Sequence, residues 1–467
     1  LGEIPLVEGA IAMHPEATAI DDGGLEVITM DQASGFDPMP AIEGNRDDLA
    51  TFIYTSGTTG MPKGVMLTHG NLLSNSDSNL EALGLGENDM TLSFLPVAHA
   101  FERTAGHYTV MVAGGMIAYA EGLTQIAQNL LEVEPTVVLT VPRLLEVIYG
   151  RIMRTVEAGS PQRQKLFHNA VATGMRAAEY CHHGRMVPPH LALQMALYRR
   201  LVFKRIRSIF GTRLRYLIAG GAPLPVEINR LLAAAEIPIV EGYGLTEASP
   251  VVAVNLHGRT RIGTVGRPLK NVEVKTAADG ELLVHGPNVM RGYYNHEEDT
   301  RETIDEEGWL HTGDIVQIDA EGFIKITDRK KEIIVLSGGK NVSPANLESR
   351  LASDPYIAQA CVIGDRRKHL AALLVPNFEN LAEQMKAAGL AGRPHEEVVA
   401  EPKFRELFQA RIREFNKPLS DVETIVAFKL IASPFTQENG ELTPTMKLRR
   451  RIVQEHYRGE IESMYGE

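Results

Sequence analysis

The sequence feature that most constrains the fold is an apolar strand, an amphipathic helix and a second apolar strand between residues 214 and 241. We expect strands at residues 214–219 and 237–241, and a helix that starts at Pro225. The helix carries one apolar face, which consists of Ile228, Leu231, Leu232 and Ala235. A crossover of this kind between parallel strands is almost always right-handed. It brings residues 220–223 and 242–244 together at the carboxyl ends of the strands, where open α/β sheets bind ligands.

The region upstream predicts a strand, a loop and a helix. Residues 49–54 form an apolar strand-like run, a loop rich in glycine and hydroxyl groups follows, and Asn71 caps a helix that runs toward Leu80. The loop is therefore expected between a strand and a helix. The acidic residues before Leu49 are punctuated by Gly and Pro, so we expect a peripheral lead-in there. The apolar run at 108–120 is too short to span a bilayer and predicts a buried core strand and turn.

The pattern changes downstream of the crossover. Residues 262–327 read as short alternating strands with turns at Asp279-Gly280 and Glu321-Gly322, which predicts an antiparallel β subdomain. The charged stretch 328–332 then marks a domain boundary. A smaller module follows, with a helix opened by Ser343 and Pro344, strands near Cys361 and Leu373, and a terminal amphipathic helix.

These patterns together predict an α/β fold with two domains. Residues 1–330 are expected to form a large N-terminal α/β domain with parallel sheets and a small antiparallel β subdomain. Residues 331–467 are expected to form a small mobile C-terminal α+β domain.

Composition excludes several classes of protein. The net charge of −12 argues against nucleic acid as the main partner, because a phosphate backbone is bound through clustered basic surface. The two cysteines, Cys181 and Cys361, lack disulfide or metal spacing, and Cys181-His182-His183 has no further ligand at metal spacing. A reducing cytoplasm fits best, and no signal peptide is expected at the start. Oligomeric state and peripheral membrane contact stay open.

The strongest local signal is Thr55-Ser56-Gly57-Thr58-Thr59-Gly60-Met61-Pro62-Lys63-Gly64. Small residues let backbone N–H groups and hydroxyls approach an anion, and a lysine lies alongside, which is typical of a phosphate-binding loop. It is not a Walker A loop, because Pro62 and Gly64 flank Lys63 where that loop needs Gly and then Ser or Thr. A generic cluster of this composition could equally be a polar turn.

The ten-residue string resembles the AMP-binding signature of the adenylate-forming superfamily, which includes acyl-CoA synthetases, luciferases and peptide adenylation domains. Four further strings match the superfamily's motifs in its order, at residues 242–247, 308–314, 328–332 and 443–447. The resemblance runs from about residue 49 to 451. It implies that a carboxylate attacks ATP with Mg²⁺ present and that coenzyme A receives the acyl group.

The resemblance assigns roles around the phosphates and the metal. Glu247 and the hydroxyl of Thr55 would hold Mg²⁺, for which hard oxygen ligands are suited. The β- and γ-phosphates would be wrapped by Ser56, Gly57, Thr58, Thr59, Gly60 and Lys63. Thr246 would bond the α-phosphate. Taken alone, Glu247 is more simply a solvated carboxylate at a strand end.

The nucleoside has its own set of residues by the same resemblance. Adenine would lie between the backbone turn Gly221-Ala222-Pro223 and the ring of Tyr243, which stands in the segment Gly242-Tyr243-Gly244. Asp314 would accept hydrogen bonds from both ribose hydroxyls and Arg329 would assist. Outside the family, Asp314 in a Thr-Gly-Asp turn is most simply a turn-stabilising side chain.

The C-terminal region supplies residues for two conformations. By resemblance, Lys447 bridges the carboxylate and the α-phosphate in the adenylation step, and the small domain then rotates about a hinge at Lys331. A loop with Ser337, Gly338, Gly339 and Lys340 would next face coenzyme A, where glycines leave room for a thin pantetheine arm. An unplaced lysine before a basic run is otherwise a solvated helix start.

Three strings indicate the branch of the family. Residues 94–103, 141–144 and 216–221 resemble long-chain fatty acyl-CoA synthetases, in which the region of His99 borders the acyl site. A lone histidine beside a proline could instead be an ordinary core or turn residue. The expected activity is therefore that of a long-chain fatty acid–CoA ligase (AMP-forming), with fatty acid, ATP and coenzyme A as substrates.

Two alternatives stay open at this point. One is an acyl-AMP ligase that loads a carrier protein, and the other is an inactive relic that binds lipid or adenylate. The family carries a substantial segment before the phosphate loop, whereas here the loop begins at Thr55. We therefore expect the large domain to lack its upstream part, including walls of the acyl tunnel.

Overall fold

The computed structural model describes residues 43–55, 62–182, 185–256, 260–330, 332–443 and 448–466, together with two short strands before them. The chain divides into two compact units, residues 1–45 and 46–467. In the first unit, strands β1 (Gly9–Ala12) and β2 (Glu26–Thr29) pair in parallel. The segment expected to be a peripheral lead-in therefore contains two short strands.

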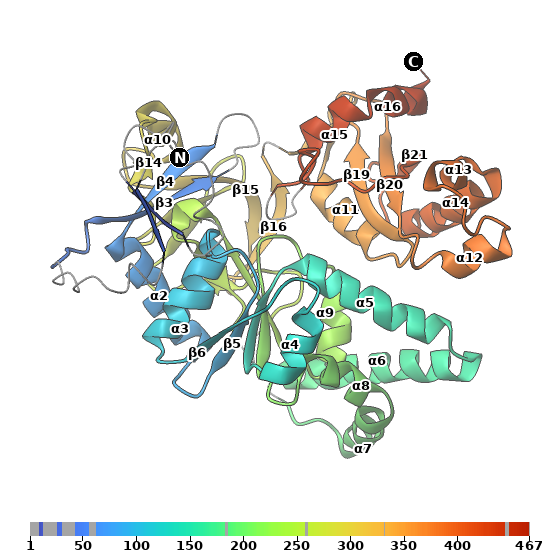
Figure 1. The fold of residues 1–467 in the computed structure, drawn as a ribbon, viewed down its shortest axis with the longest axis horizontal. Helices are drawn as coiled ribbons and strands as arrows, with labels where there is room; N and C mark the ends of the chain where they lie inside the picture. The colour runs from blue at the N-terminus through green and yellow to red at the C-terminus, as the bar shows by residue number, and fades with distance from the viewer. Residues whose placement is uncertain are drawn as a thin grey trace. The chain divides into compact units, whose positions relative to one another are not determined.

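A seven-stranded sheet forms the centre of the second unit, in the order β11-β10-β9-β8-β7-β5-β6 (Figure 1). Its five strands from β9 to β6 are parallel, whereas β10 pairs antiparallel with both β9 and β11. The strands are β5 (Met90–Ser93), β6 (Met116–Tyr119), β7 (Val137–Thr140), β8 (Tyr216–Ala219), β9 (Ile239–Gly244), β10 (Val251–Val254) and β11 (Arg267–Pro268).

Helices cover both faces of this sheet because its central strands are apolar on both sides. In β7, Val137 and Leu139 pack into one core and Val138 packs into the other. The first core also takes side chains from α2 (His69–Leu83), the π-helix η2 (Glu102–Tyr108) and α3 (Thr109–Val112). The second takes side chains from α4 (Ile126–Val133), α5 (Pro142–Glu157), α6 (Pro161–His182), α7 (Pro189–Tyr198) and α9 (Val226–Ala234).

The crossover predicted from the sequence is confirmed as β8-α9-β9. Strands β8 and β9 pair in parallel, and α9 begins one residue after Pro225, which is its N-cap. Its buried face includes Ile228, Leu231 and Leu232. Strand β9 continues to Gly244 instead of ending at Glu241, because β10 pairs with its last three residues.

The phosphate-loop string lies in a hairpin, so its predicted place between a strand and a helix is wrong. Strand β3 (Leu49–Thr55) pairs antiparallel with β4 (Lys63–Thr68), which the sequence analysis did not foresee. Val65 and Leu67 of β4 are fully buried. The cap of α2 is Thr68, and Asn71 is the third helical residue of a capping box.

The apolar run at 108–120 is also not a buried strand and turn. Residues up to Val112 are helical, in η2 and α3, and only β6 is extended. Because β6 is an edge strand, its Met116 and Tyr119 are exposed. The length and hydrophobicity of a short apolar segment do not distinguish a helix from a buried strand.

The antiparallel subdomain is confirmed as a four-stranded sheet in the order β12-β13-β15-β16. Its two predicted turns join β12 to β13 and β15 to β16. Strand β14 (Gly292–Tyr293) lies outside this sheet and pairs with β4. Helix α10 (Glu297–Thr303) follows it. The four strands are β12 (Glu273–Thr276), β13 (Glu281–His285), β15 (Leu310–Ile318) and β16 (Ile324–Arg329).

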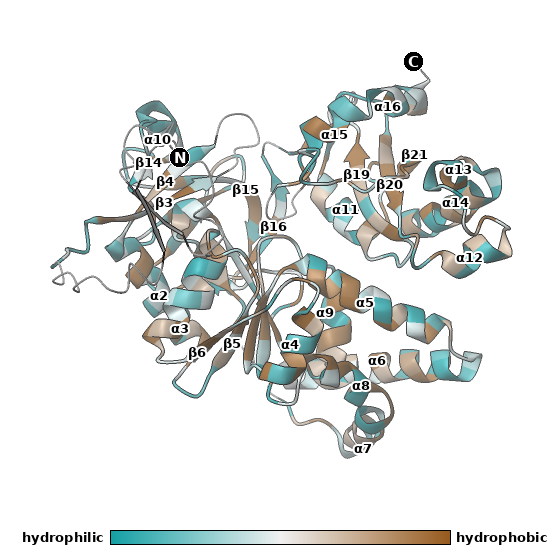
Figure 2. Cartoon of the chain, viewed as in Figure 1, coloured by the Kyte–Doolittle hydropathy of each residue, from teal (hydrophilic) through white to brown (hydrophobic). Residues whose placement is uncertain are grey.

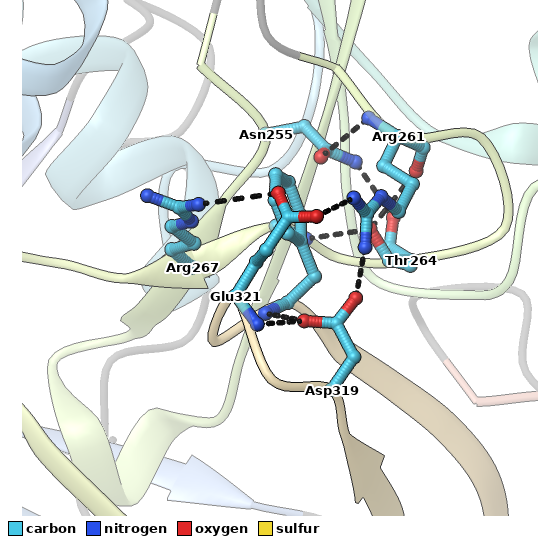
Figure 3. A network of polar contacts seen from close by, with 8 residues as sticks. Asn255, Arg261, Thr264, Arg267, Asp319 and Glu321 are labelled. Atoms are coloured by element: carbon cyan, nitrogen blue, oxygen red, sulfur yellow. Dashed lines mark hydrogen bonds and ion pairs between the residues drawn. The ribbon is translucent and has the colours of Figure 1, made fainter.

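A polar network connects this sheet to the segment that precedes β11 (Figure 3). Arg261 pairs with Asp319 and, at 2.9 Å, with Glu321, and its guanidinium lies over the ring of Phe323. The side chain of Asn255 accepts from the Arg261 N–H and donates to the Thr264 carbonyl. The charged turn between β15 and β16 is thereby joined to the large sheet.

The C-terminal region has its own core around a three-stranded sheet, β19-β20-β21, whose strands β19 and β20 are strongly hydrophobic (Figure 2). Ser343 and Pro344 open α11, and the strands near Cys361 and Leu373 and the terminal helices are present as predicted. The elements are β17 (Ile334–Val335), β18 (Asn341–Val342), α11 (Pro344–Ala352), β19 (Ile357–Ile363), β20 (Leu370–Pro376), α12 (Ala382–Ala387), α13 (His395–Ala400), α14 (Pro402–Asn416), β21 (Ile425–Leu430), α15 (Arg450–His456) and α16 (Arg458–Tyr465).

The predicted fold class is therefore confirmed: a large α/β region with a separate C-terminal α+β region. Among the helices in the described part of the chain, none combines the length and hydrophobicity that crossing a bilayer requires.

Candidate active site

The turn after β8 lies at the carboxyl edge of the parallel strands. Residues Gly221, Ala222 and Pro223 are exposed there, and Gly221 has a φ of +84°, which only glycine adopts without strain. A Cβ at Gly220 would lie 2.9 Å from Cζ of Phe101, so the turn packs closely on the segment that enters η2. The turn is an exposed backbone surface at the ligand edge of the sheet.

Tyr243 and Arg329 both hold the carboxylate of Asp314. Tyr243 Oη donates to Asp314 Oδ2 at 2.6 Å, and Arg329 Nε donates to Oδ1 at 2.9 Å. Asp314 and Arg329 are register partners in β15 and β16, and the Asp314 side chain is only 5% exposed. Burial, together with the charge of Asp314, raises the pKa of Tyr243 well above its usual value. The phenol therefore stays a donor to the carboxylate at all physiological pH values.

Glu247 lies in a short 3₁₀ helix, Thr246–Ala248, that follows β9. Tyr293 Oη donates to its Oε1 at 2.8 Å, and burial followed by the Glu247 charge raises the pKa of Tyr293. The residue is partly exposed. The bond from Tyr293 is to Oε1, and a carboxylate offers the hard oxygens that a cation such as Mg²⁺ prefers.

Lys63 belongs to the same cluster through β14. Its Nζ lies 5.2 Å from the centre of the Tyr293 ring and pairs with Asp299 at the start of α10. The ion pair with Lys63 lowers the pKa of Asp299. The antiparallel pairing of β14 with β4 thus brings Lys63 to the ring of the tyrosine whose hydroxyl bonds Glu247.

The loop between Thr55 and Lys63 is closed at its base. The two residues are register partners, and Thr55 Oγ1 donates to the Lys63 carbonyl at 3.5 Å. Ser56, Gly57, Thr58, Thr59 and Gly60 lie outside the described residues.

The other predicted residues of the large domain lie at the same edge of the sheet. Gly242 and Gly244 end β9, and Thr246 opens the 3₁₀ helix that carries Glu247. The ring of His99 accepts from the Phe101 N–H at 3.3 Å, immediately before η2. Because Phe101 packs on Gly220, the His99 segment lies beside the turn after β8.

In the C-terminal region, Lys447 and Lys331 both lie outside the described residues. The ends of the Lys447 loop are fixed: Leu442 and Leu448 form an antiparallel bridge, and Arg449 N–H donates to the Glu441 carbonyl at 2.7 Å. Directly after it, Arg450 binds both oxygens of Glu348 at 2.5 and 3.0 Å. The loop therefore emerges from a rigid base.

The predicted coenzyme-facing residues form a tight turn between β17 and β18. Gly339 has a φ of +74° and its N–H donates to the Leu336 carbonyl at 2.8 Å. A Cβ at Gly338 or Gly339 would meet no described atom within 4 Å. Ser337 donates its N–H to the Arg367 carbonyl, and Lys340 accepts from the Leu336 N–H.

Sequence reasoning missed Tyr293 and Asp299. Tyr293 lies in β14, which joins a distant hairpin, and Asp299 lies in the helix that follows, and no local periodicity shows this pairing. The signal that could have indicated them is the tyrosine pair after Gly292, a short aromatic segment between two turns.

With this geometry established, comparison with known proteins identifies the family. The sequence profile described as AMP-binding enzyme matches residues 8–294, and the one described as AMP-binding enzyme C-terminal domain matches residues 331–467. The chain therefore belongs to the AMP-binding, adenylate-forming family.

Relatives and solved structures agree with this assignment. The chain is 38% identical over 424 residues to fadD11 of Mycobacterium tuberculosis, covering 90% of this chain and 74% of that protein. It is 36% identical over 428 residues to the long-chain-fatty-acid–CoA ligase FadD15 of Mycobacterium tuberculosis, covering 90% and 70%. The structure of the adenylation domain of a Mycobacterium chelonae carboxylate reductase matches with a TM-score of 0.74 at 24% identity, over 95% of this chain and 64% of that one.

The chain spans less than two thirds of the length of that adenylation domain. ATP and Mg²⁺ are typical of the family, and o-succinylbenzoate coenzyme A synthetase of Bacillus subtilis, with a TM-score of 0.64 at 22% identity over 95% of this chain and 78% of that one, has been solved with both.

Proposed function

We propose that the chain is an ATP-dependent long-chain fatty acid–CoA ligase. The observation that carries the proposal is the buried carboxylate of Asp314, which Tyr243 and Arg329 hold at the ligand edge of the sheet. An ionised carboxylate fixed in this way suits two neighbouring hydroxyls, such as those of a ribose. The long-chain substrate is supported by FadD15, at 36% identity.

In the first step, a carboxylate oxygen of the fatty acid attacks the α-phosphorus of ATP. An acyl–O–P bond forms, the bond to the pyrophosphate oxygen breaks, and pyrophosphate leaves. Asp314 would bind the ribose, while the ring of Tyr243 and the turn Gly221-Ala222-Pro223 would enclose adenine. Thr246 would bond the α-phosphate, and Lys447 would offset the charge of the two anions at the reacting centre.

The donors near Glu247 fit a magnesium ion, because Glu247 and Thr55 supply hard oxygens and Tyr293 bonds only one oxygen of the carboxylate. When bound with the nucleotide, Mg²⁺ would supply positive charge at the phosphate oxygens. Lys63 would exchange Asp299 for the β- and γ-phosphates together with the loop residues 56–60.

In the second step, the sulfur of coenzyme A attacks the acyl carbon, the acyl–oxygen bond breaks and AMP leaves. The glycine turn at residues 337–339 would pass the pantetheine arm, since among the described residues no atom lies within 4 Å of a Cβ placed on Gly338 or Gly339. We place the domain boundary at residues 330 and 331, with Lys331 as the hinge of a mobile C-terminal domain. His99 would border the acyl chain.

The decisive variant is Lys447→Ala. Loss of this cation should slow palmitate-dependent pyrophosphate release from ATP by at least ~100-fold. Conversion of synthetic palmitoyl-AMP and coenzyme A to palmitoyl-CoA should stay within about twofold, because Lys447 serves only the first step. Lys429→Ala, at an exposed lysine of β21, is the matched control.

Equal loss in both half-reactions would contradict the two-conformation mechanism. Omitting coenzyme A separates the alternative of a carrier-loading ligase, which would release AMP only when a carrier protein accepts the acyl group.

A further inference from the structure

A long stretch of this acidic chain contains no acidic residue. The chain has a net charge of −12, yet no Asp or Glu occurs between Glu179 and Glu227. The stretch contains eight basic residues: Arg185, Arg199, Arg200, Lys204, Arg205, Arg207, Arg213 and Arg215. A segregation of charge this strong indicates an anionic partner.

Most of these cations lie on one continuous helical segment. Helix α7 continues without a break into the π-helix η3 (Arg199–Phe203), then α8 (Lys204–Arg207) and a 3₁₀ turn (Ser208–Phe210). In Figure 1 this segment, labelled α7 and α8, lies below α6. We call the segment from Pro189 to Phe210 the basic helix.

The inner side of the basic helix is already satisfied. It buries Leu191, Met195, Phe203, Ile206 and Phe210, each at most 5% exposed, against the core. Two of the cations also serve the fold: Arg199 binds Glu236 at 2.6 and 2.5 Å, and Arg207 donates to the Glu236 carbonyl at 2.6 Å. The packing of the basic helix on the rest of the protein is therefore complete without further apolar residues.

The outer side nevertheless carries three leucines. Leu193, Leu197 and Leu201 recur every fourth residue and are 75%, 55% and 52% exposed. Residues four apart are neighbours on a helix surface, so the leucines form a stripe. Met186, just before the helix, is 92% exposed.

Cations lie along the same stripe. Arg200, Lys204 and Arg205 are exposed, and within the part of the chain that the structure describes no carboxylate pairs with their side chains. Arg200 and Lys204 are themselves four residues apart and flank Leu201. Apolar and basic side chains therefore share one solvent-facing surface.

We propose that the basic helix docks this protein on an anionic lipid bilayer, with Leu193, Leu197 and Leu201 in the interface and Arg200, Lys204 and Arg205 at the headgroups. Helices that lie on membranes combine these two features, exposed apolar residues and cations on the face toward the lipid. A nucleic acid would use the cations but leave the leucines in water. A second copy of the same surface would place cations against cations.

The test is sedimentation of the full chain with vesicles of phosphatidylcholine, with and without phosphatidylglycerol. We expect binding to the anionic vesicles that weakens when salt rises from ~0.1 M to ~1 M, because the Debye length falls from ~10 Å to ~3 Å. The triple variant Arg200→Glu, Lys204→Glu, Arg205→Glu should lower the affinity at least ~100-fold, since each cation near such a surface contributes about fivefold. Leu193→Ser, Leu197→Ser, Leu201→Ser should lower it at least ~10-fold.

Two controls match these variants in charge and in exposed apolar area. Lys386→Glu, Lys403→Glu, Lys429→Glu makes the same charge change at exposed lysines of the C-terminal region. Met111→Ser, Leu123→Ser, Leu131→Ser removes side chains that are 65%, 76% and 56% exposed. Both controls should bind vesicles within about twofold of the parent chain.

Three results would overturn the proposal. The first is no binding to anionic vesicles, and the second is an equal loss in the controls. The third is a stable dimer, or a complex with RNA, that the basic-helix variants abolish while vesicle binding is unchanged. Palmitate-dependent AMP release in detergent should be the same in all four variants, so failure of the membrane proposal is distinguishable from failure of the proposed function.

Discussion

At the scale of single residues, Tyr243 combines a ring at the ligand edge with a hydroxyl that fixes a carboxylate. The bond to Asp314 is 2.6 Å long and buried. A hydrogen bond to a charged group of this kind is worth about 1.5–3 kcal/mol. The tyrosine therefore positions Asp314, and its hydroxyl can be removed without removing the ring.

We expect Tyr243→Phe to raise the KM for ATP by about 10-fold or more and to change kcat less, because ribose binding loses a fixed acceptor. The control is Tyr216→Phe, which removes a buried hydroxyl that donates to the Leu83 carbonyl at 2.7 Å in the same sheet. It should reduce stability and leave the KM for ATP unchanged. Steady-state kinetics with ATP varied checks both, and equal KM values for the two variants would contradict the role given to Asp314.

Glu241, next to the predicted adenine site, makes stability depend on pH. Burial, partly offset by the bond from Asn229, raises its pKa from 4.5 to about 8. The folded chain therefore holds one more proton than the unfolded chain between these two pH values. Stability from this group is fully present below pH 4.5, falls as the pH rises through the window, and levels off above about 8.

Glu241→Gln keeps the shape and the acceptor for Asn229 but cannot ionise. We expect its melting temperature to exceed that of the parent chain at pH 8 and to approach it at pH 5, as measured by thermal denaturation across this range. Glu179→Gln, at an exposed carboxylate, should show no such divergence. A constant offset at every pH would show that Glu241 is ionised in the folded chain.

At the scale of elements, helix α2 connects the phosphate-loop hairpin to a distant segment. The Thr68 side chain accepts from the Asn71 N–H at 3.1 Å, and Asn71 Oδ1 accepts from the Thr68 N–H at 2.9 Å. Asn71 Nδ2 also donates to the carbonyls of Pro287 and Val289. Asn71 thus caps the helix and holds the segment that leads into β14.

Thr68→Ala should cost about 1 kcal/mol, the usual price of an N-cap. Asn71→Ala should cost about 2–3 kcal/mol, because three bonds lose a partner and two carbonyls lose their donor. Urea unfolding followed by circular dichroism measures both. Equal costs would show that the contacts to residues 287 and 289 contribute nothing to stability.

The sequence predicted the elements whose pattern is local. The crossover β8-α9-β9 and the antiparallel sheet could be predicted because their strands are short apolar runs bounded by a helix or by turn residues. Strands β8 and β13 are accordingly buried along nearly their whole length. Strand β4 was missed, since it begins with Lys63 and Gly64 and is defined by its pairing with β3 and β14. Segment 108–120 was mistaken for a buried strand because an apolar run does not show whether it forms a helix or an edge strand.

The candidate site shows the same limit. Asp314, Glu247 and Tyr243 could be predicted because each lies in a contiguous motif of the family. The bonds that fix them come from elsewhere: Tyr293 reaches Glu247 from β14, and Tyr243 reaches Asp314 across two sheets. Tertiary partners of this kind are set by sheet pairing and not by sequence spacing.

At the scale of the whole molecule, the proposed function predicts a dependence on acyl chain length. Each CH₂ group buried in an acyl tunnel contributes ~0.8 kcal/mol of transfer free energy, or about fourfold in kcat/KM, until the tunnel is filled. We therefore expect kcat/KM to rise steadily from acetate through octanoate to palmitate, measured as AMP release with ATP and coenzyme A. A higher kcat/KM with acetate or an aryl acid would contradict the long-chain assignment and leave the family assignment standing.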